Sequence, residues 1–91
     1  EKFAIVVDIK RCINAVMEKA IEASKQYHKK TTLQEMDVEL EKLRHYLRLS
    51  HELGFLPPKK YEILSRNVDE IGRMLGGWIK YAAENPVPNK R

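Results

Sequence analysis

Apolar side chains in the last third of the chain recur at alternating steps of three and four residues. The series runs through Tyr61, Leu64, Val68, Ile71, Leu75, Trp78 and Ala82. Steps of this size return to one side of an α-helix, and their alternation is typical of a helix that packs lengthwise against another helix. A half-buried β-strand would instead alternate at every second residue. The pattern therefore predicts a helix over about residues 58–83 and limits the chain to a fold made by packing helices.

Two earlier segments carry the same helical periodicity. In residues 3–28 the apolar positions are Ile5, Ile9, Cys12, Val16, Ala20, Ala23 and Tyr27, widened by Val6, Ile13, Met17 and Ile21. In residues 32–53 the series is Leu33, Met36, Leu40, Leu43, Leu47, Ser50 and Leu53. Each series covers one face of a helix. The sequence thus predicts three helices and no strand.

Residues with well-known roles at helix ends mark the borders of these segments. Thr32 is followed three residues later by Glu35, which is the pattern of a capping box and predicts the start of the second helix. Gly54 is suited to the left-handed conformation that ends a helix. Pro57 and Pro58 fit the entrance to the third helix.

Short connections between long helices predict that neighbours in sequence run antiparallel. We therefore expect an all-α, up-and-down antiparallel helical bundle formed by residues 1–84. The polar, proline-bearing residues 85–91 should form a frayed tail. With 91 residues, the chain is one domain.

Composition limits the cellular compartments and the kinds of partner that we expect for this chain. A single cysteine excludes an internal disulfide and fits a reducing compartment. There is no run of 18 apolar residues and no signal-peptide pattern, so we expect a soluble, cytoplasmic protein without a membrane contact. The formal net charge of +4 modestly favours polyanionic partners.

Catalytic and metal-binding patterns are missing from the sequence. The residues three before His28, His45 and His51 are basic, so the Glu-x-x-His pairs of di-iron bundles do not occur. Cys12 falls on an apolar stripe, where a buried and inert thiol is expected. The serines lack an evident base and orienting acid. We predict no catalytic residue, no metal site and no cofactor, and hence no enzyme.

Basic residues offer a more specific signal. Arg44 and Arg48 are four residues apart on one helix face, and Glu41, the nearest acid on that face, can pair with only one of them. Two guanidinium groups with few partners form a candidate phosphate-binding patch. Other basic residues that could extend the patch are Lys10, Arg11, Lys59 and Lys60. No aromatic platform for stacking single-stranded bases is apparent.

Three glycines interrupt the third predicted helix beside its tryptophan. Gly72, Gly76 and Gly77 each cost a helix about 1 kcal/mol relative to alanine. Missing side chains at this spacing would let another helix approach closely. We interpret these glycines and Trp78 as a helix-packing or oligomer contact. The alternative is that the glycines merely loosen a helix near its end.

Residues 40–81 resemble the accessory variability determinant (Avd) proteins of diversity-generating retroelements. The resemblance rests on "LRHYLRL", "ELGFL" and "EIGRMLGGW", and residues 1–13 are a looser match to the second helix of that family. The wider group consists of small bacterial four-helix bundle proteins and includes proteins encoded in 23S rRNA intervening sequences.

The resemblance implies a non-catalytic four-helix bundle that assembles into a homopentameric ring with a basic surface. It also implies association with a reverse transcriptase and with RNA or DNA during mutagenic cDNA synthesis and retrohoming. The first helix of the family, which should precede "EKF", is absent from this sequence. An apolar groove should then lie open, to be filled by a missing segment or a partner chain.

Two other functions stay open at this point. The chain could be an RNA-associated bundle of the rRNA-intervening-sequence type without a transcriptase partner. It could also be a purely structural oligomer whose positive charge serves solubility.

Overall fold

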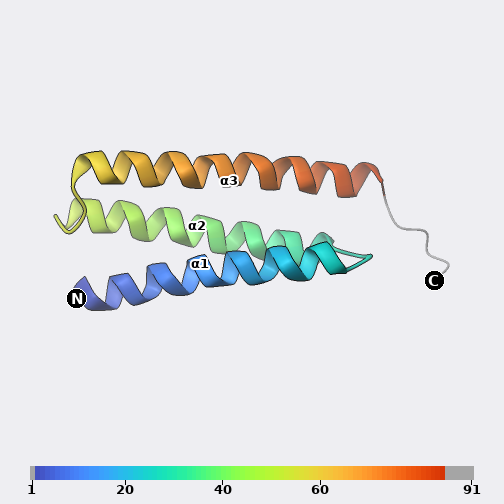
Figure 1. Cartoon of the computed structure of the whole chain (residues 1–91), viewed down its shortest axis with the longest axis horizontal. Helices are drawn as coiled ribbons and strands as arrows, with labels where there is room; N and C mark the ends of the chain where they lie inside the picture. The colour runs from blue at the N-terminus through green and yellow to red at the C-terminus, as the bar shows by residue number, and fades with distance from the viewer. Residues whose placement is uncertain (1, 86–91) are drawn as a thin grey trace.

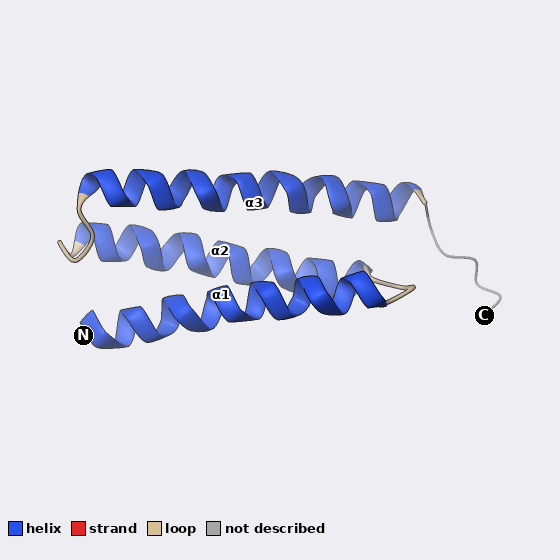
Figure 2. Cartoon of the chain, in the orientation of Figure 1, coloured by secondary structure: helices blue, strands red, loops and turns tan. Residues whose placement is uncertain are grey.

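The computed structural model describes residues 2–85, which form three α-helices and, within that range, no strand (Figures 1 and 2). The helices are α1 (Lys2–Lys25), α2 (Lys30–Glu52) and α3 (Pro58–Glu84). The prediction of an all-helical fold is confirmed for these residues. The predicted tail lies outside the described residues except for Asn85.

Consecutive helices run antiparallel, and α2 lies between the two others (Figure 1). Both α1 and α3 pack against α2, while within residues 2–85 α1 and α3 do not contact each other. The molecule is correspondingly long and thin, with extents of 53 × 21 × 14 Å. Residues 2–85 thus form an open three-helix arrangement rather than a closed four-helix bundle.

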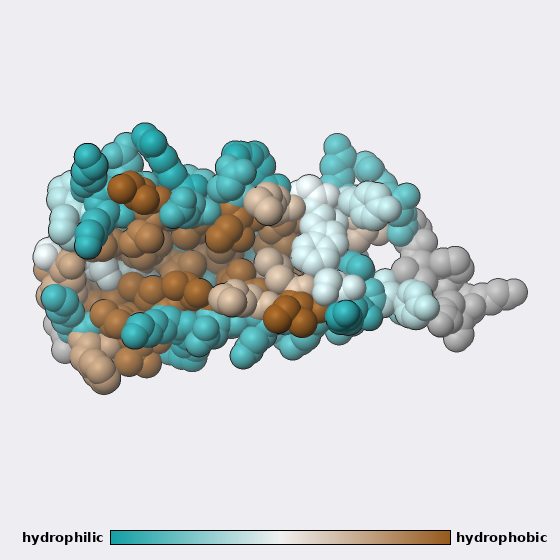
Figure 3. Space-filling view, in the orientation of Figure 1, coloured by the Kyte–Doolittle hydropathy of each residue, from teal (hydrophilic) through white to brown (hydrophobic). Residues whose placement is uncertain are grey.

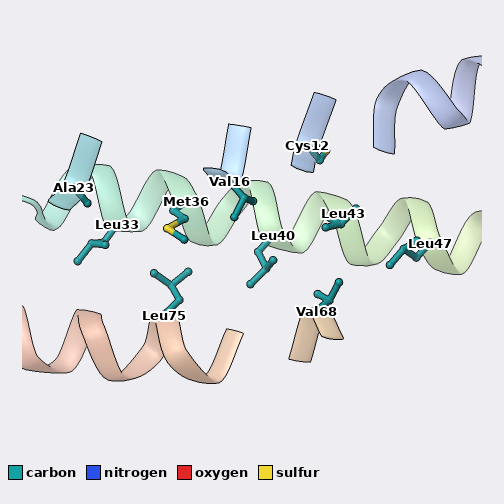
Figure 4. Close-up of a cluster of buried hydrophobic side chains, with 10 residues drawn as sticks. All are labelled: Cys12, Val16, Ala23, Leu33, Met36, Leu40, Leu43, Leu47, Val68 and Leu75. Carbon is teal, nitrogen blue, oxygen red and sulfur yellow. The ribbon is translucent and has the colours of Figure 1, made fainter. Parts of the chain in front are cut away.

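The core follows the apolar stripe of α2, which meets α1 on one flank and α3 on the other (Figure 4). The buried apolar side chains of the cluster are Leu33, Met36, Leu40, Leu43 and Leu47 of α2, Cys12, Val16 and Ala23 of α1, and Val68 and Leu75 of α3. An ion pair adds to the contact between α1 and α2, because the ammonium group of Lys19 donates to Glu35 at 2.8 Å. This hydrogen bond raises the pKa of Lys19.

The connection between α1 and α2 differs from the sequence-based expectation. α1 ends at Lys25 instead of about residue 28, and α2 begins at Lys30, two residues before the expected start. The predicted capping box is therefore wrong. The hydroxyl of Thr32 donates to the side-chain oxygen of Gln26 at 2.7 Å, inside the first turn of α2, and Glu35 is occupied by the ion pair described above. Polar contacts across the turn replace the cap that the local pattern suggested.

The connection between α2 and α3 agrees with expectation. Gly54 has a φ of +83°, the left-handed conformation that a glycine adopts without strain. The N–H of Gly54 donates to the carbonyl of His51, and the N–H of Phe55 donates to that of Ser50, at 3.0 and 2.9 Å. These two bonds are the Schellman pattern that ends a helix. Pro57 caps α3, and Pro58 is its first residue.

One face of the molecule is apolar and open. Figure 3 shows hydrophobic surface running along the molecule between α1 and α3. The exposed large apolar side chains of the two outer helices include Phe3, Val6, Ile13, Met17 and Ile21 of α1 and Leu64, Ile71 and Met74 of α3. An apolar surface is therefore exposed in residues 2–85, where the resemblance led us to expect an apolar groove. Within this range no helix is long and apolar enough to cross a membrane.

Candidate nucleic-acid interface

The antiparallel topology places the predicted basic residues in one half of the molecule. They belong to the first half of α1, the last half of α2 and the start of α3, which all lie at the left in Figure 1. We call this set the basic end, and it consists of Lys10, Arg11, Arg44, Arg48, Lys59 and Lys60. Residues distant in sequence thus belong to the same half of the molecule.

Arg44 differs from the prediction that it has few partners. Its side chain is half-buried, and its guanidinium group donates to Glu41 at 2.6 Å and lies 3.5 Å from the carboxylate of Asp69. The first contact is within α2, and the second joins α2 to α3. Because two carboxylates already surround it, Arg44 serves the contact between helices and offers little free charge.

Arg11 is also paired. Its guanidinium group donates to the carboxylate of Asp8, one turn earlier on α1. The pair is at the surface, where solvent screens both charges. Arg11 therefore contributes less to an external field than its exposure suggests.

The remaining four residues of the basic end are unpaired. Arg48 is exposed, and within residues 2–85 its side chain has no hydrogen bond or ion pair, because Glu41, which was expected to pair with only one of the two arginines, pairs with Arg44. The side chains of Lys10, Lys59 and Lys60 are also exposed and have no hydrogen bond or ion pair in the part of the chain that the structure describes. We call Lys10, Arg48, Lys59 and Lys60 the unpaired cations. Their donors are free to bind phosphate groups.

The three glycines of α3 have different surroundings. A Cβ atom on Gly72 would lie 2.5 Å from Nη2 of Arg44 and 3.5 Å from Cδ2 of Leu40. This glycine makes room for a side chain of α2, whereas we expected it to admit a helix backbone. At Gly76 and Gly77 an added Cβ would have no neighbour within 4 Å among the described residues. A contact between copies through these two positions stays a prediction.

Trp78 lies at the other end of the molecule, where the last turns of α3 approach the connection between α1 and α2. Its ring is half-buried against the core, and the ammonium group of Lys29 lies 5.8 Å from the ring centre. A cavity of about 610 Å³ opens here, lined among others by Tyr27, Lys30 and Tyr81. The sequence analysis missed this grouping of aromatic rings and lysines. The only local signal was the spacing of Trp78 and Tyr81, three residues apart on one helix.

Cys12 has the environment expected of a structural thiol. It is fully buried between α1 and α2. Burial, followed by the nearby carboxylate of Glu39, raises the pKa of Cys12 above its ordinary value of 9.0. The thiol therefore stays protonated at neutral pH and is a poor nucleophile. Within residues 2–85, no three His, Cys, Asp or Glu side chains form a group that could hold a metal ion.

Fold and surface together define the class of this protein: a small antiparallel helical protein that exposes an apolar face and several unpaired basic side chains. Comparison with known proteins gives the family. The chain belongs to the bAvd-like family, whose model matches residues 1–82. This is an accessory, non-catalytic family. No curated protein and no solved structure matches the chain.

Proposed function

We propose that the protein is a non-catalytic accessory protein of a diversity-generating retroelement. In this role it is a basic, oligomeric scaffold that binds the reverse transcriptase and holds template RNA or cDNA against it during mutagenic retrohoming. Membership of the bAvd-like family supports the accessory role. The transcriptase and the assembly into a homopentamer come from the resemblance of residues 40–81 to Avd proteins, and the cytoplasmic location is the expectation drawn from composition.

The observation that carries the nucleic-acid part of the proposal is the grouping of four unpaired cations in one half of the molecule. Each lysine or arginine that neutralises a phosphate releases condensed counterions, and this release drives binding without regard to base sequence. Assembly would strengthen the effect. Five copies of a chain with a net charge of +4 would bring together about +20, with bound counterions ignored.

Charge reversal at the basic end tests this proposal. The double variant Arg48→Glu with Lys59→Glu should weaken binding to a long single-stranded RNA about tenfold or more. The slope of log affinity against log salt concentration should also fall by about 2, since two phosphate contacts are lost. Fluorescence anisotropy across a salt titration measures both quantities.

The chain offers a matched control for that variant. Lys25 and Lys80 are exposed, and within the described residues they are without ion pairs. Lys25→Glu with Lys80→Glu lowers the formal net charge by four, from +4 to zero, as the first variant does. It should weaken binding much less. Equal losses in the two variants would show that the basic end has no special role in binding.

The transcriptase partnership has its own test. If a reverse-transcriptase gene lies beside the gene for this protein, the two products should co-purify. Arg48→Glu with Lys59→Glu, measured in the same experiment, shows whether the basic end also contacts the enzyme. A protein that binds nucleic acid and never retains the transcriptase would contradict the retroelement role.

A further inference from the structure

The cavity beside Trp78 is lined by aromatic rings and cations that come from separate parts of the chain. Tyr27, Lys29 and Lys30 belong to the connection between α1 and α2 and the first residue of α2, while Trp78 and Tyr81 belong to the last turns of α3. Figure 3 shows that the strongly hydrophobic surface gives way to less hydrophobic side chains toward this end of the molecule. The cavity is thus chemically distinct from the open apolar face.

The rings are arranged so that a planar ligand could lie against them. Trp78 packs one side on the core, which holds the indole in place, while Tyr81 is 64% exposed one turn further along. A nucleobase stacks on an accessible aromatic face, which Tyr81 already offers. On Trp78 a base can stack once the flexible side chain of Lys29, which lies over the ring, moves aside toward the phosphate. The volume of about 610 Å³ is within the range of small-molecule sites and is large enough for a nucleotide.

The charge of the lining selects for an anion. Lys30 is exposed and, within residues 2–85, unpaired, and Lys29 is held over Trp78. No carboxylate is present among the described residues that line the cavity. The side-chain amides of Gln26 and Gln34 add donors and acceptors that could meet the edge of a base. Rings, cations and amides together fit a nucleotide better than an acidic peptide, which has no planar base to stack.

We propose that this cavity binds an unpaired base of single-stranded nucleic acid, with the base against Trp78 and Tyr81 and its phosphate toward Lys29 and Lys30. This inference rests on the proposed nucleic-acid function and adds a second, chemically different contact to it. The cavity lies at the last turns of α3, whereas Lys59 and Lys60 lie in its first turn, about 27 Å away along the helix at 1.5 Å per residue. The fluorescence of Trp78 therefore reports on binding in the cavity rather than at Lys59 and Lys60.

Fluorescence provides a direct test, because Trp78 is the only tryptophan of the chain. A uridine trinucleotide should quench its fluorescence saturably, because the base stacks on the indole. Inorganic tripolyphosphate, which has charge and no base, should not. Equal quenching by both compounds, or no quenching by the trinucleotide, would overturn the inference.

Variants that keep the tryptophan sharpen this test. Tyr81→Leu should weaken trinucleotide binding about tenfold, as expected for the loss of one stacking ring. Because Tyr81 is largely exposed, the helix should be unaffected, which circular dichroism can verify. Lys30→Gln should weaken binding by a smaller factor, and Lys80→Gln, at the same end and outside the cavity lining, should have no effect. Unchanged affinity in folded Tyr81→Leu and Lys30→Gln would contradict the proposed site.

The two proposals can fail separately. Arg48→Glu with Lys59→Glu should leave quenching by the trinucleotide intact if the cavity is a site of its own. Loss of long-RNA binding in that variant, without any trinucleotide quenching in the wild type, would uphold the basic end and reject the cavity. Trinucleotide quenching together with undiminished long-RNA binding in that variant would uphold the cavity and reject the basic end.

Discussion

The central helix and the two outer helices have similar apolar stripes but bury them to different extents. α2 buries seven residues, whereas α3, which is longer, buries two. Leu40 of α2 is fully buried, while Met17 of α1, which also belongs to an apolar stripe, is 58% exposed. The difference arises because α2 has a neighbour on each flank and each outer helix has only one. Burial in this protein depends on the order of the helices more than on the strength of each apolar pattern.

Truncation in the central helix should have the largest effect. Leu40→Ala should lower the free energy of unfolding by about 2–5 kcal/mol, because it removes a buried side chain and leaves a cavity. Met17→Ala on the open side should change it by less than about 1 kcal/mol. Urea unfolding of both variants measures the contrast. A Met17→Ala loss as large as that of Leu40→Ala would mean that the open apolar face is covered in solution.

A polar atom placed between α1 and α2 should have the next largest effect. Cys12→Ser should destabilise the protein by about 1–3 kcal/mol, because the serine hydroxyl would be buried in an apolar contact that has no hydrogen-bond partner placed for it. Cys12→Ala, which adds no polar group, should cost less. Equal stabilities of the two variants would show that water reaches the contact between α1 and α2. This contact would then differ less from the open apolar face than we infer.

The thiol also gives this contact a pH dependence. Burial raises the pKa of Cys12 above 9.0 in the folded chain, so the unfolded chain loses this proton first as the pH rises. The contribution of the Cys12 thiol to the free energy of unfolding is therefore complete below pH 9.0 and declines above it. The stability difference between the wild type and Cys12→Ala should shrink in that window. A difference that grows with pH would contradict the assigned sign.

Changes at the exposed glycines of α3 should have the smallest effect. Gly76→Ala should stabilise the chain by about 0.5–1 kcal/mol, because alanine favours the helix and the added Cβ meets nothing within 4 Å. Gly72→Ala should gain less, since its Cβ would displace the Arg44 guanidinium from Glu41 and Asp69. Thermal unfolding with analytical ultracentrifugation measures both. Destabilisation or dissociation by Gly76→Ala would instead reveal a close contact between copies.

Local patterns predicted much of the fold and part of the candidate site. The three helical segments, the stop at Gly54 and the start at Pro58 follow from periodicity and from backbone preferences that act within a few residues. The same reasoning failed at Thr32, where contacts with Gln26 and the neighbouring helix outweighed a capping pattern. It also failed at Arg44, whose second carboxylate, Asp69, is 25 residues away and could not be assigned from spacing on one helix.

By itself, the sequence determined that this protein is helical, where α2 turns into α3, and which family it resembles. The helices and this turn follow from patterns a few residues long, and the resemblance follows from longer motifs. Only the tertiary structure decided which half of each apolar stripe is buried, which arginines remain unpaired, and that Trp78 meets Lys29 beside a cavity. These outcomes depend on which helices become neighbours. Contacts between residues distant along the chain have no local signal, so packing had to be known before the pairing of Arg44 with Asp69 and the cavity could be recognised.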